Sequence, residues 1–336
     1  VYATPEHLYL AVYEPGSGPW RVNSASAAGT RVHKFDLTES VARPVYDASG
    51  RVDGHVLNSF AMDDNGENFR IATTQFEGRN WTPSSNLFVM QQAANELMTV
   101  GEVTGIEPGE EIYSVRFMDD TAYIVTFFQM DPLFTFDLSD PQNPQQLGEL
   151  EITGFSTYMH PLGSNHLIGI GEEVDPDSGI FEGMQISLFD VSDLTDPLMT
   201  DRVVIDTGWS WSEAMYDHHA FNYYGPLDML TIPVNYEGAE YGSVSFAGLH
   251  AYEITPGNDI LLMGEVDASA LIDPTVEDYY GQYCAQVRRS VVIEDVVYAI
   301  SAGGIIAAGI DDLASPYATL AFPDHGNCDQ TWEWWM

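Results

Sequence analysis

Residues 111–171 read EIYSVRFMDDTAYIVTFFQMDPLFTFDLSDPQNPQQLGELEITGFSTYMHPLGSNHLIGIG, and this stretch decides the fold. Short runs rich in Val, Ile, Phe, Tyr and Thr alternate with groups of Asp, Asn, Gly and Pro, which is typical of short strands joined by tight turns. Four such runs form one unit before the series begins again at Tyr158. We expect the strands of this unit at Ile112–Met118, Ala122–Phe128, Leu133–Leu138 and Gln145–Ile152.

The end of the third strand and the turn after it recur along the chain. Phe136-Asp137-Leu138-Ser139-Asp140 with Pro144 is matched by Phe189-Asp190-Val191-Ser192-Asp193 with Pro197. Weaker copies lie at Phe35–Thr38, Leu87–Val89, Tyr252–Ile254 with Pro256, and Ile310–Asp312 with Pro316. Successive copies are about 45 to 65 residues apart, near the period of four-stranded propeller blades. The sequence therefore predicts an all-β protein, a β-propeller of four-stranded antiparallel blades with six repeats visible and room for a seventh or further blade.

The repeats favour one domain, because a single blade cannot bury its own faces. We assign residues 1–323 of the 336 to the propeller and residues 324–336 to a C-terminal tail. The two cysteines, Cys284 and Cys328, lack metal-ligand spacing, so a disulfide in an oxidising compartment is favoured over a zinc or redox site. This bond would tie the tail back to the last blade.

The charge balance is strongly acidic, with 51 Asp and Glu against 11 Lys and Arg and a formal net charge of −40. Nucleic acid is excluded as a partner, because binding a phosphate backbone needs clustered basic residues. The acidity is spread over all repeats, which indicates a solvated coat for a saline or extracellular medium, or affinity for cations and basic partners. No run of about 18 apolar residues is present, so no membrane span is expected.

A loop in the fourth repeat is a candidate calcium site. Glu173, Asp175 and Asp177 fall at alternate positions before Gly179. Alternating carboxylates beside a glycine can surround a hard cation with oxygen ligands. The full calcium-loop motif and its closing Glu are absent, so an ordinary acidic loop is the alternative interpretation.

A second candidate site follows from the topology of a propeller, in which the first strand of each blade lines the central channel. The predicted first strands carry Arg116, His160, Glu213 with Asp217 and His218, and Arg288 with Arg289. Polar groups that converge from different blades could form a small-ligand or ion site. Alternatively, they could be buried charges satisfied by pairing, in which case Arg116 and Arg288 should each pair with a carboxylate of a neighbouring blade.

Two further features concern histidine and tryptophan. His218 and His219 would point to opposite faces of a strand, so on a strand they could not both ligate one metal unaided. The tail segment Trp332–Trp335 holds three tryptophans, and such an apolar end is expected to pack on the body or on a partner protein.

Several segments resemble the family of secreted bacterial and archaeal proteins with a C-terminal β-propeller domain distantly related to WD repeats. These segments, in the order and spacing of the family, are Tyr113–Met118, Asp131–Phe134, Asp137–Pro141, His160-Pro161, His166–Gly171, Ser212–Ala214, Tyr216–His218 and Arg288–Ser290. The resemblance covers nearly the whole chain. It implies a propeller fold and export, and it supplies no catalytic residues because the family has no established activity.

Two functions remain open from the sequence. The favoured one is a secreted, non-catalytic module, extracellular, cell-surface or periplasmic, that binds other proteins through blade faces and the Trp332–Trp335 tail, with calcium as a candidate cofactor. The chain begins at Val1 without Met, as a processed or truncated product would. The alternative is a metal-dependent enzyme that uses His160, His218 and nearby carboxylates in the central channel. No catalytic motif such as Gly-x-Ser-x-Gly or His-Glu-x-x-His is present, which favours the first function.

Overall fold

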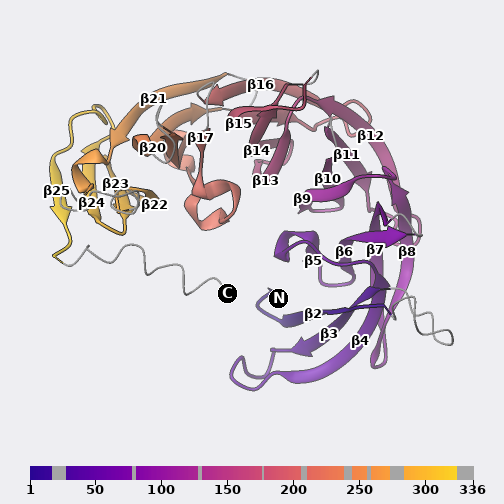
Figure 1. Cartoon of the computed structure of the whole chain (residues 1–336). Coiled ribbons are helices and arrows are strands. Elements are labelled where there is room, and N and C mark those ends of the chain that lie inside the picture. The colour runs from indigo at the N-terminus through magenta and orange to yellow at the C-terminus, as the bar shows by residue number, and fades with distance from the viewer. Residues whose placement is uncertain are drawn as a thin grey trace. The chain divides into compact units, whose positions relative to one another are not determined.

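The protein is described here from a computed structural model. The structure describes residues 1–16, 28–77, 81–127, 131–175, 178–205, 210–237, 244–255, 259–272 and 284–323. The chain divides into two compact units, one of residues 1–167 with 191–198 and one of residues 168–190 with 199–336. The strands form sheets in which most neighbouring strands are antiparallel and consecutive along the chain (Figure 1).

The first sheet has eight strands in the order β1-β2-β3-β4-β8-β7-β6-β5. Its two antiparallel sets of four are joined by a single parallel bridge between Ser49 and Glu96. The strands are β1 (Tyr2–Ala3), β2 (His7–Glu14), β3 (Gly29–Asp36), β4 (Val45–Asp53), β5 (Met62–Asp64), β6 (Phe69–Glu77), β7 (Thr82–Ala93) and β8 (Glu96–Ile106).

The next two sheets have four strands each, in chain order across the sheet. The first is formed by β9 (Glu111–Met118), β10 (Thr121–Phe127), β11 (Asp131–Asp137) and β12 (Gln145–Ile152). The second is formed by β13 (Phe155–Leu162), β14 (His166–Val174), β15 (Phe181–Asp190) and β16 (Leu198–Ile205). The strands predicted from the opening stretch are therefore confirmed, with bounds that differ by a few residues.

The last two sheets belong to the second unit. One contains β17 (Ser210–Trp211), β18 (Asn222–Tyr224), β19 (Met229–Glu237), β20 (Val244–Ile254) and β21 (Ile260–Asp267). The other contains β22 (Val287–Ile293), β23 (Val296–Ser301), β24 (Gly304–Gly309) and β25 (Ala318–Ala321). Helix is limited, in the described ranges, to the three-residue 3₁₀ helices η1 (Ser59–Ala61), η2 (Glu213–Met215), η3 (His218–Ala220), η4 (Gly225–Leu227) and η5 (Ser269–Leu271). None of them is long enough to cross a membrane.

The cores explain why the inner strands are continuously apolar. In β10, residues 122–126 are all buried, so both faces of this strand are covered. One core cluster combines residues of β6 and β7, such as Ala72 and Leu87, with Ile124 and Phe136 of the next sheet. The sheets of the first unit therefore pack face to face, whereas outer strands such as β12 alternate between buried and exposed residues.

The turn that repeats in the sequence repeats in the structure. In four copies a backbone amide donates to the carbonyl three residues earlier, as for Asn143 to Asp140 at 3.0 Å and Asp196 to Asp193 at 3.1 Å. We call residues 40–44, 140–144, 193–197 and 312–316 the repeat turns. The turn 140–144 lies against Gly101 of β8, and the turn 193–197 lies against Gly148 of β12, where Pro197 Cδ would be 2.9 Å from an added Cβ. These two repeat turns thus cover the outer strand of the preceding sheet.

Three sequence-based expectations need correction or lie outside the described residues. Glu213 and His218 lie on 3₁₀ helices and not on strands, because Ser212 and Asp217 cap these helices with their side chains. Glu173 lies on β14 and not in a loop. Asp177, Cys328 and the Trp332–Trp335 tail lie outside the described residues, so the calcium loop, the disulfide and the packing of the tail stay predictions.

Candidate functional site

Arg116 lies on β9 and reaches across to β13 in the first unit. Its Nε donates to the carbonyl oxygen of Met159 at 2.8 Å, and Nη2 donates to the same oxygen at 2.5 Å. Its guanidinium carbon lies 4.2 Å from the ring centroid of Phe60 and 5.3 Å from that of Tyr158. Burial lowers the pKa of Arg116, and the two aromatic faces offset part of the cost of burying the charge.

His160 is the second predicted site residue on this strand pair. Tyr158 Oη lies 3.2 Å from His160 Nδ1. Burial, and secondarily the positive charge of Arg116, lowers the pKa of His160 to about 4. The imidazole is therefore neutral at physiological pH, where it can accept or donate a hydrogen bond but carries no charge.

The remaining predicted residues come together in the second unit. We call Glu213, Asp217, His218, His219, Arg288 and Arg289 the histidine–arginine cluster. Both arginines lie on β22, and the other four residues lie on η2, on η3 or at their caps. The short helices form because Ser212 Oγ accepts from the amide of Ala214 at 3.1 Å and Asp217 Oδ1 accepts from that of His219 at 3.0 Å.

Arginine–carboxylate pairs connect the parts of the cluster. Arg289 Nη2 donates to Asp217 Oδ2, and Arg289 Nη1 lies 3.9 Å from Glu213 Oε1. Arg288 Nη1 lies 3.7 Å from the same oxygen of Glu213. The predicted pairing with a carboxylate is thus confirmed for Arg288. It is wrong for Arg116, for which no ion pair is present in the described part of the chain, because a carbonyl and two rings take that place.

Asp217 connects the arginines to the histidines. Its Oδ1 lies 2.7 Å from His219 Nδ1, and the ring centroids of His218 and His219 are 3.9 Å apart. Burial raises the pKa of Asp217, but hydrogen bonds from His219 and the charge of Arg289 outweigh burial and lower it overall. One ligand atom from each of Asp217, His218 and His219 lies within 4.8 Å of the others.

The predicted calcium ligands are arranged differently from the expectation. Arg202 Nη1 donates to Glu173 Oε2 at 2.6 Å, so this buried carboxylate is paired with a cation. Asp175 Oδ1 accepts from the amide of Ser178 at 2.7 Å and thereby stabilises the turn. The calcium site stays a prediction, because Asp177 lies outside the described residues.

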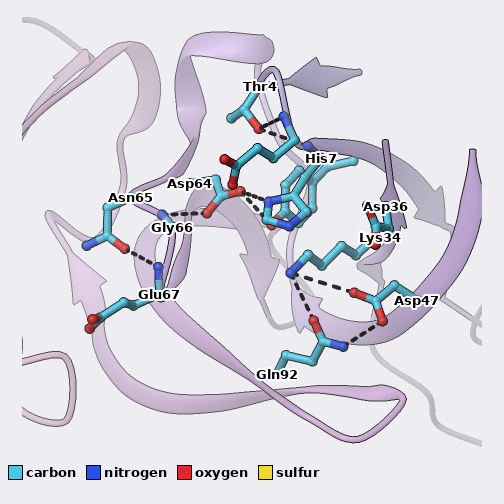
Figure 2. A network of polar contacts seen from close by, with 12 residues as sticks. Thr4, His7, Lys34, Asp36, Asp47, Asp64, Asn65, Gly66, Glu67 and Gln92 are labelled. Carbon is cyan, nitrogen blue, oxygen red and sulfur yellow. Dashed lines mark hydrogen bonds and ion pairs between the residues drawn. The ribbon is translucent and has the colours of Figure 1, made fainter. Parts of the chain in front are cut away.

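A polar network on the first sheet was not predicted from the sequence. Figure 2 shows the ammonium of Lys34, the only lysine of the chain, beside Gln92 and Asp47, with Nζ 2.9 Å from Gln92 Oε1 and 3.8 Å from Asp47 Oδ2. In the same view His7 Nδ1 lies 2.7 Å from Asp64 Oδ2. The residues of these pairs lie on β2, β3, β4, β5 and β7. They are not part of the repeat motif, and they come together only because these strands pair in one sheet.

Comparison with known proteins places the chain in a family. The family model described as "Beta propeller domain" matches residues 1–313. An uncharacterized protein of Methanocaldococcus jannaschii is 46% identical over 174 residues, which are 52% of this chain and 26% of that protein. An uncharacterized protein of Archaeoglobus fulgidus is 33% identical over 254 residues, 75% of this chain and 37% of that protein. The chain thus spans between a quarter and two fifths of the length of these relatives.

A solved structure agrees on the fold. The periplasmic gluconolactonase PpgL of Pseudomonas aeruginosa superposes with a TM-score of 0.53, at 9% identity, over 95% of this chain and 83% of that one. At this identity the similarity concerns the fold alone. The antiparallel four-stranded sheets, the recurring turn and the family match over residues 1–313 agree, and the chain belongs to the β-propeller domain family.

Proposed function

We propose that this β-propeller is a non-catalytic module that binds another protein through the first repeat turn, residues 40–44. One observation carries the proposal: this turn has the backbone geometry of the other repeat turns, yet its contact residues face solvent. The amide of Arg43 donates to the carbonyl of Ser40 at 3.1 Å, as in the other copies. Val41 is 75% exposed, whereas its counterpart Leu313 is 3% exposed.

The prolines of the turns differ only in part. Pro144 and Pro197 are buried against the preceding sheet, whereas Pro44 and Pro316 are exposed, so the exposure of Val41 distinguishes the first turn and the exposure of its proline does not. The strand that follows continues the apolar surface, with Val45 55% and Tyr46 51% exposed. Exposed apolar residues grouped on one surface are typical of interaction sites.

The covered turns indicate the chemistry of the partner. At two of them a glycine of an outer β-strand lets the backbone of the turn approach closely, at Gly101 and Gly148. Thr135 Oγ1 adds a hydrogen bond to the carbonyl of Leu194 in the second of these contacts. We therefore infer that the partner offers an outer β-strand with a glycine at the contact position.

Photo-crosslinking tests this function. A benzophenone amino acid replaces Val41, and in a control chain it replaces Val12, which is 49% exposed on β2. Both chains are irradiated in an extract of the native organism, and the products are identified by mass spectrometry. We expect a product at position 41 only, with the label on a glycine-containing strand of another protein. Equal products at both positions, a product between two copies of this chain, or a link within one chain would contradict the proposal.

The enzyme alternative has less support. Arg116 is engaged by Met159 and Glu213 by Arg288, so these groups act as internal partners. A location outside the cytoplasm accompanies the proposed function and is supported by the acidic composition and the pair of cysteines.

A further inference from the structure

We propose that Asp217, His218 and His219 bind one divalent transition-metal ion of the zinc type. This inference is independent of the protein-binding function, because all three residues lie in the second unit and the first repeat turn lies in the first. On a strand, the side chains of His218 and His219 would point to opposite faces and could not both bind one ion unaided. In the structure both histidines belong to the 3₁₀ helix η3, so this objection does not apply.

The geometry brings three ligands together. One ligand atom of each residue lies within 4.8 Å of the others, and the imidazole centroids are 3.9 Å apart. In a tetrahedral site with bonds near 2.0 to 2.1 Å, neighbouring ligand atoms are about 3.4 Å apart. Small side-chain rotations would bring the three atoms to this separation, and water would complete the coordination of the ion.

The backbone that holds these side chains is fixed by hydrogen bonds. The amide of Asp217 donates to the carbonyl of Glu213 at 2.8 Å, and that of Ala220 donates to the carbonyl of Asp217 at 3.0 Å. Ala220 is fully buried and anchors the end of η3. A preformed turn lowers the cost of ordering the ligands when the ion binds.

The ligand set selects the class of ion. Two neutral imidazoles with one carboxylate suit Zn²⁺, Ni²⁺ or Cu²⁺, whereas Ca²⁺ prefers six or more oxygen atoms. The carboxylates of Glu213 and Asp217 are already balanced by Arg288 and Arg289. The cluster therefore offers little net negative charge to a hard cation, and nitrogen ligation has to supply the affinity.

Binding needs no net loss of a proton. In the neutral side chain, the proton between His219 Nδ1 and Asp217 Oδ1 can move to Nε2 through solvent, because the side chain of His219 is 67% exposed. Nδ1 and the carboxylate oxygen then both face the ion as lone-pair donors. Asp217 keeps its second oxygen for Arg289.

The test is a titration of the metal-free full chain with ZnCl₂ by calorimetry. We expect one site, and in the double variant His218→Ala/His219→Ala an affinity lower by about ten-fold or more. A control double variant, His33→Ala/His166→Ala, keeps the affinity of the parent. Cu²⁺ loaded to one equivalent should show nitrogen splitting in its electron paramagnetic resonance spectrum, and the splitting should be absent from the His218/His219 variant.

Competition with excess CaCl₂ distinguishes zinc bound by the two histidines from zinc bound by carboxylates of the acidic surface. Zinc bound by imidazoles should stay bound, whereas zinc held by carboxylates alone should be displaced. No zinc binding by the parent chain, an unchanged affinity in the His218/His219 variant, or displacement by Ca²⁺ would each overturn the proposal. Circular dichroism of the variant shows that any loss of binding occurs in a folded protein.

Discussion

At the scale of single residues, the buried side chains of Arg116 and His250 have aromatic neighbours, whereas the buried guanidinium of Arg70 pairs with the carboxylate of Asp63. Arg116 donates to one carbonyl and lies over two aromatic rings. His250, which is 2% exposed, lies between two tyrosines, with Tyr236 Oη 3.1 Å from Nε2 and Tyr252 Oη 2.8 Å from Nδ1. Aromatic residues therefore form much of the environment of both groups, and for His250 the carboxylate of Glu265 also lies close, with Oε1 3.4 Å from Nε2.

The replacement Arg116→Ala should lower the melting temperature by roughly 3 to 6 °C, since it removes a charge-assisted hydrogen bond and two cation–π contacts. Arg116→Lys should lie between the parent and Arg116→Ala, because an ammonium keeps the charge but lacks the planar group. Thermal denaturation followed by circular dichroism measures the effect, and the exposed Arg43→Ala serves as control. A lysine variant as stable as the parent would show that the planar stacking has no role.

His250 should make stability depend on pH. Burial lowers its pKa to about 4, below the value near 6.5 of the unfolded chain. The unfolded state therefore binds the proton first, and the stabilisation present above pH 6.5 is lost as the pH falls toward 4, by roughly 3 kcal/mol at pH 4. Urea denaturation gives the free energy of unfolding at pH 7 and at pH 4.5. The difference between these two values should be smaller for His250→Gln than for the parent. Equal differences in the two proteins would contradict the buried neutral histidine.

At the scale of strands and turns, the sequence predicted the structural features that repeat along the chain, and it did not predict the contacts that occur only once. The strands around Ile124 and the turns at Asp140 and Asp193 were predictable, because the same residue types recur at the same spacing. The partner of Arg116 was not predictable, since a backbone carbonyl leaves no residue-type signal and Phe60 lies in η1, outside the repeat motif. Ser212 and Asp217 could have revealed η2 and η3, because both are favoured helix N-caps.

The contact between a repeat turn and an outer strand can be tested at Gly148. A Cβ at this position would overlap the carbonyl oxygen of Leu194 and lie 3.0 Å from Thr135 Oγ1. Gly148→Ala should therefore destabilise the protein by about 1 to 3 kcal/mol, because the turn must move away from the strand. Urea denaturation measures the loss, and Gly225→Ala, with the nearest atom 4.0 Å away, is the control. Equal effects at both glycines would mean that close approach of the turn is not needed.

At the scale of the whole molecule, the net negative charge destabilises the folded state, whereas the packed cores stabilise it. The formal net charge of −40 creates mutual repulsion that unfolding relieves, since the unfolded chain spreads the carboxylates over a larger volume. Local pairs such as Arg202 with Glu173 and Arg289 with Asp217 relieve this repulsion at a few places. With 11 basic residues against 51 acidic ones, most carboxylates have no basic residue of their own. Stability should therefore depend on the ions of the solution more than in a protein of balanced charge.

The melting temperature should accordingly rise as NaCl is raised from about 0.05 M to 1 M, because the Debye length falls from above 10 Å to about 3 Å and the repulsion between carboxylates is screened. KCl at equal ionic strength should act alike, since screening does not depend on the identity of the monovalent cation. Sucrose is the control, because it favours compact states without screening charge. When the pH is lowered toward 4, carboxylates become protonated. The rise in melting temperature with salt should then shrink, whereas the rise with sucrose should persist. A melting temperature that is independent of salt at pH 7, or that falls with added salt, would mean that the ion pairs of this chain outweigh the repulsion among its unpaired carboxylates.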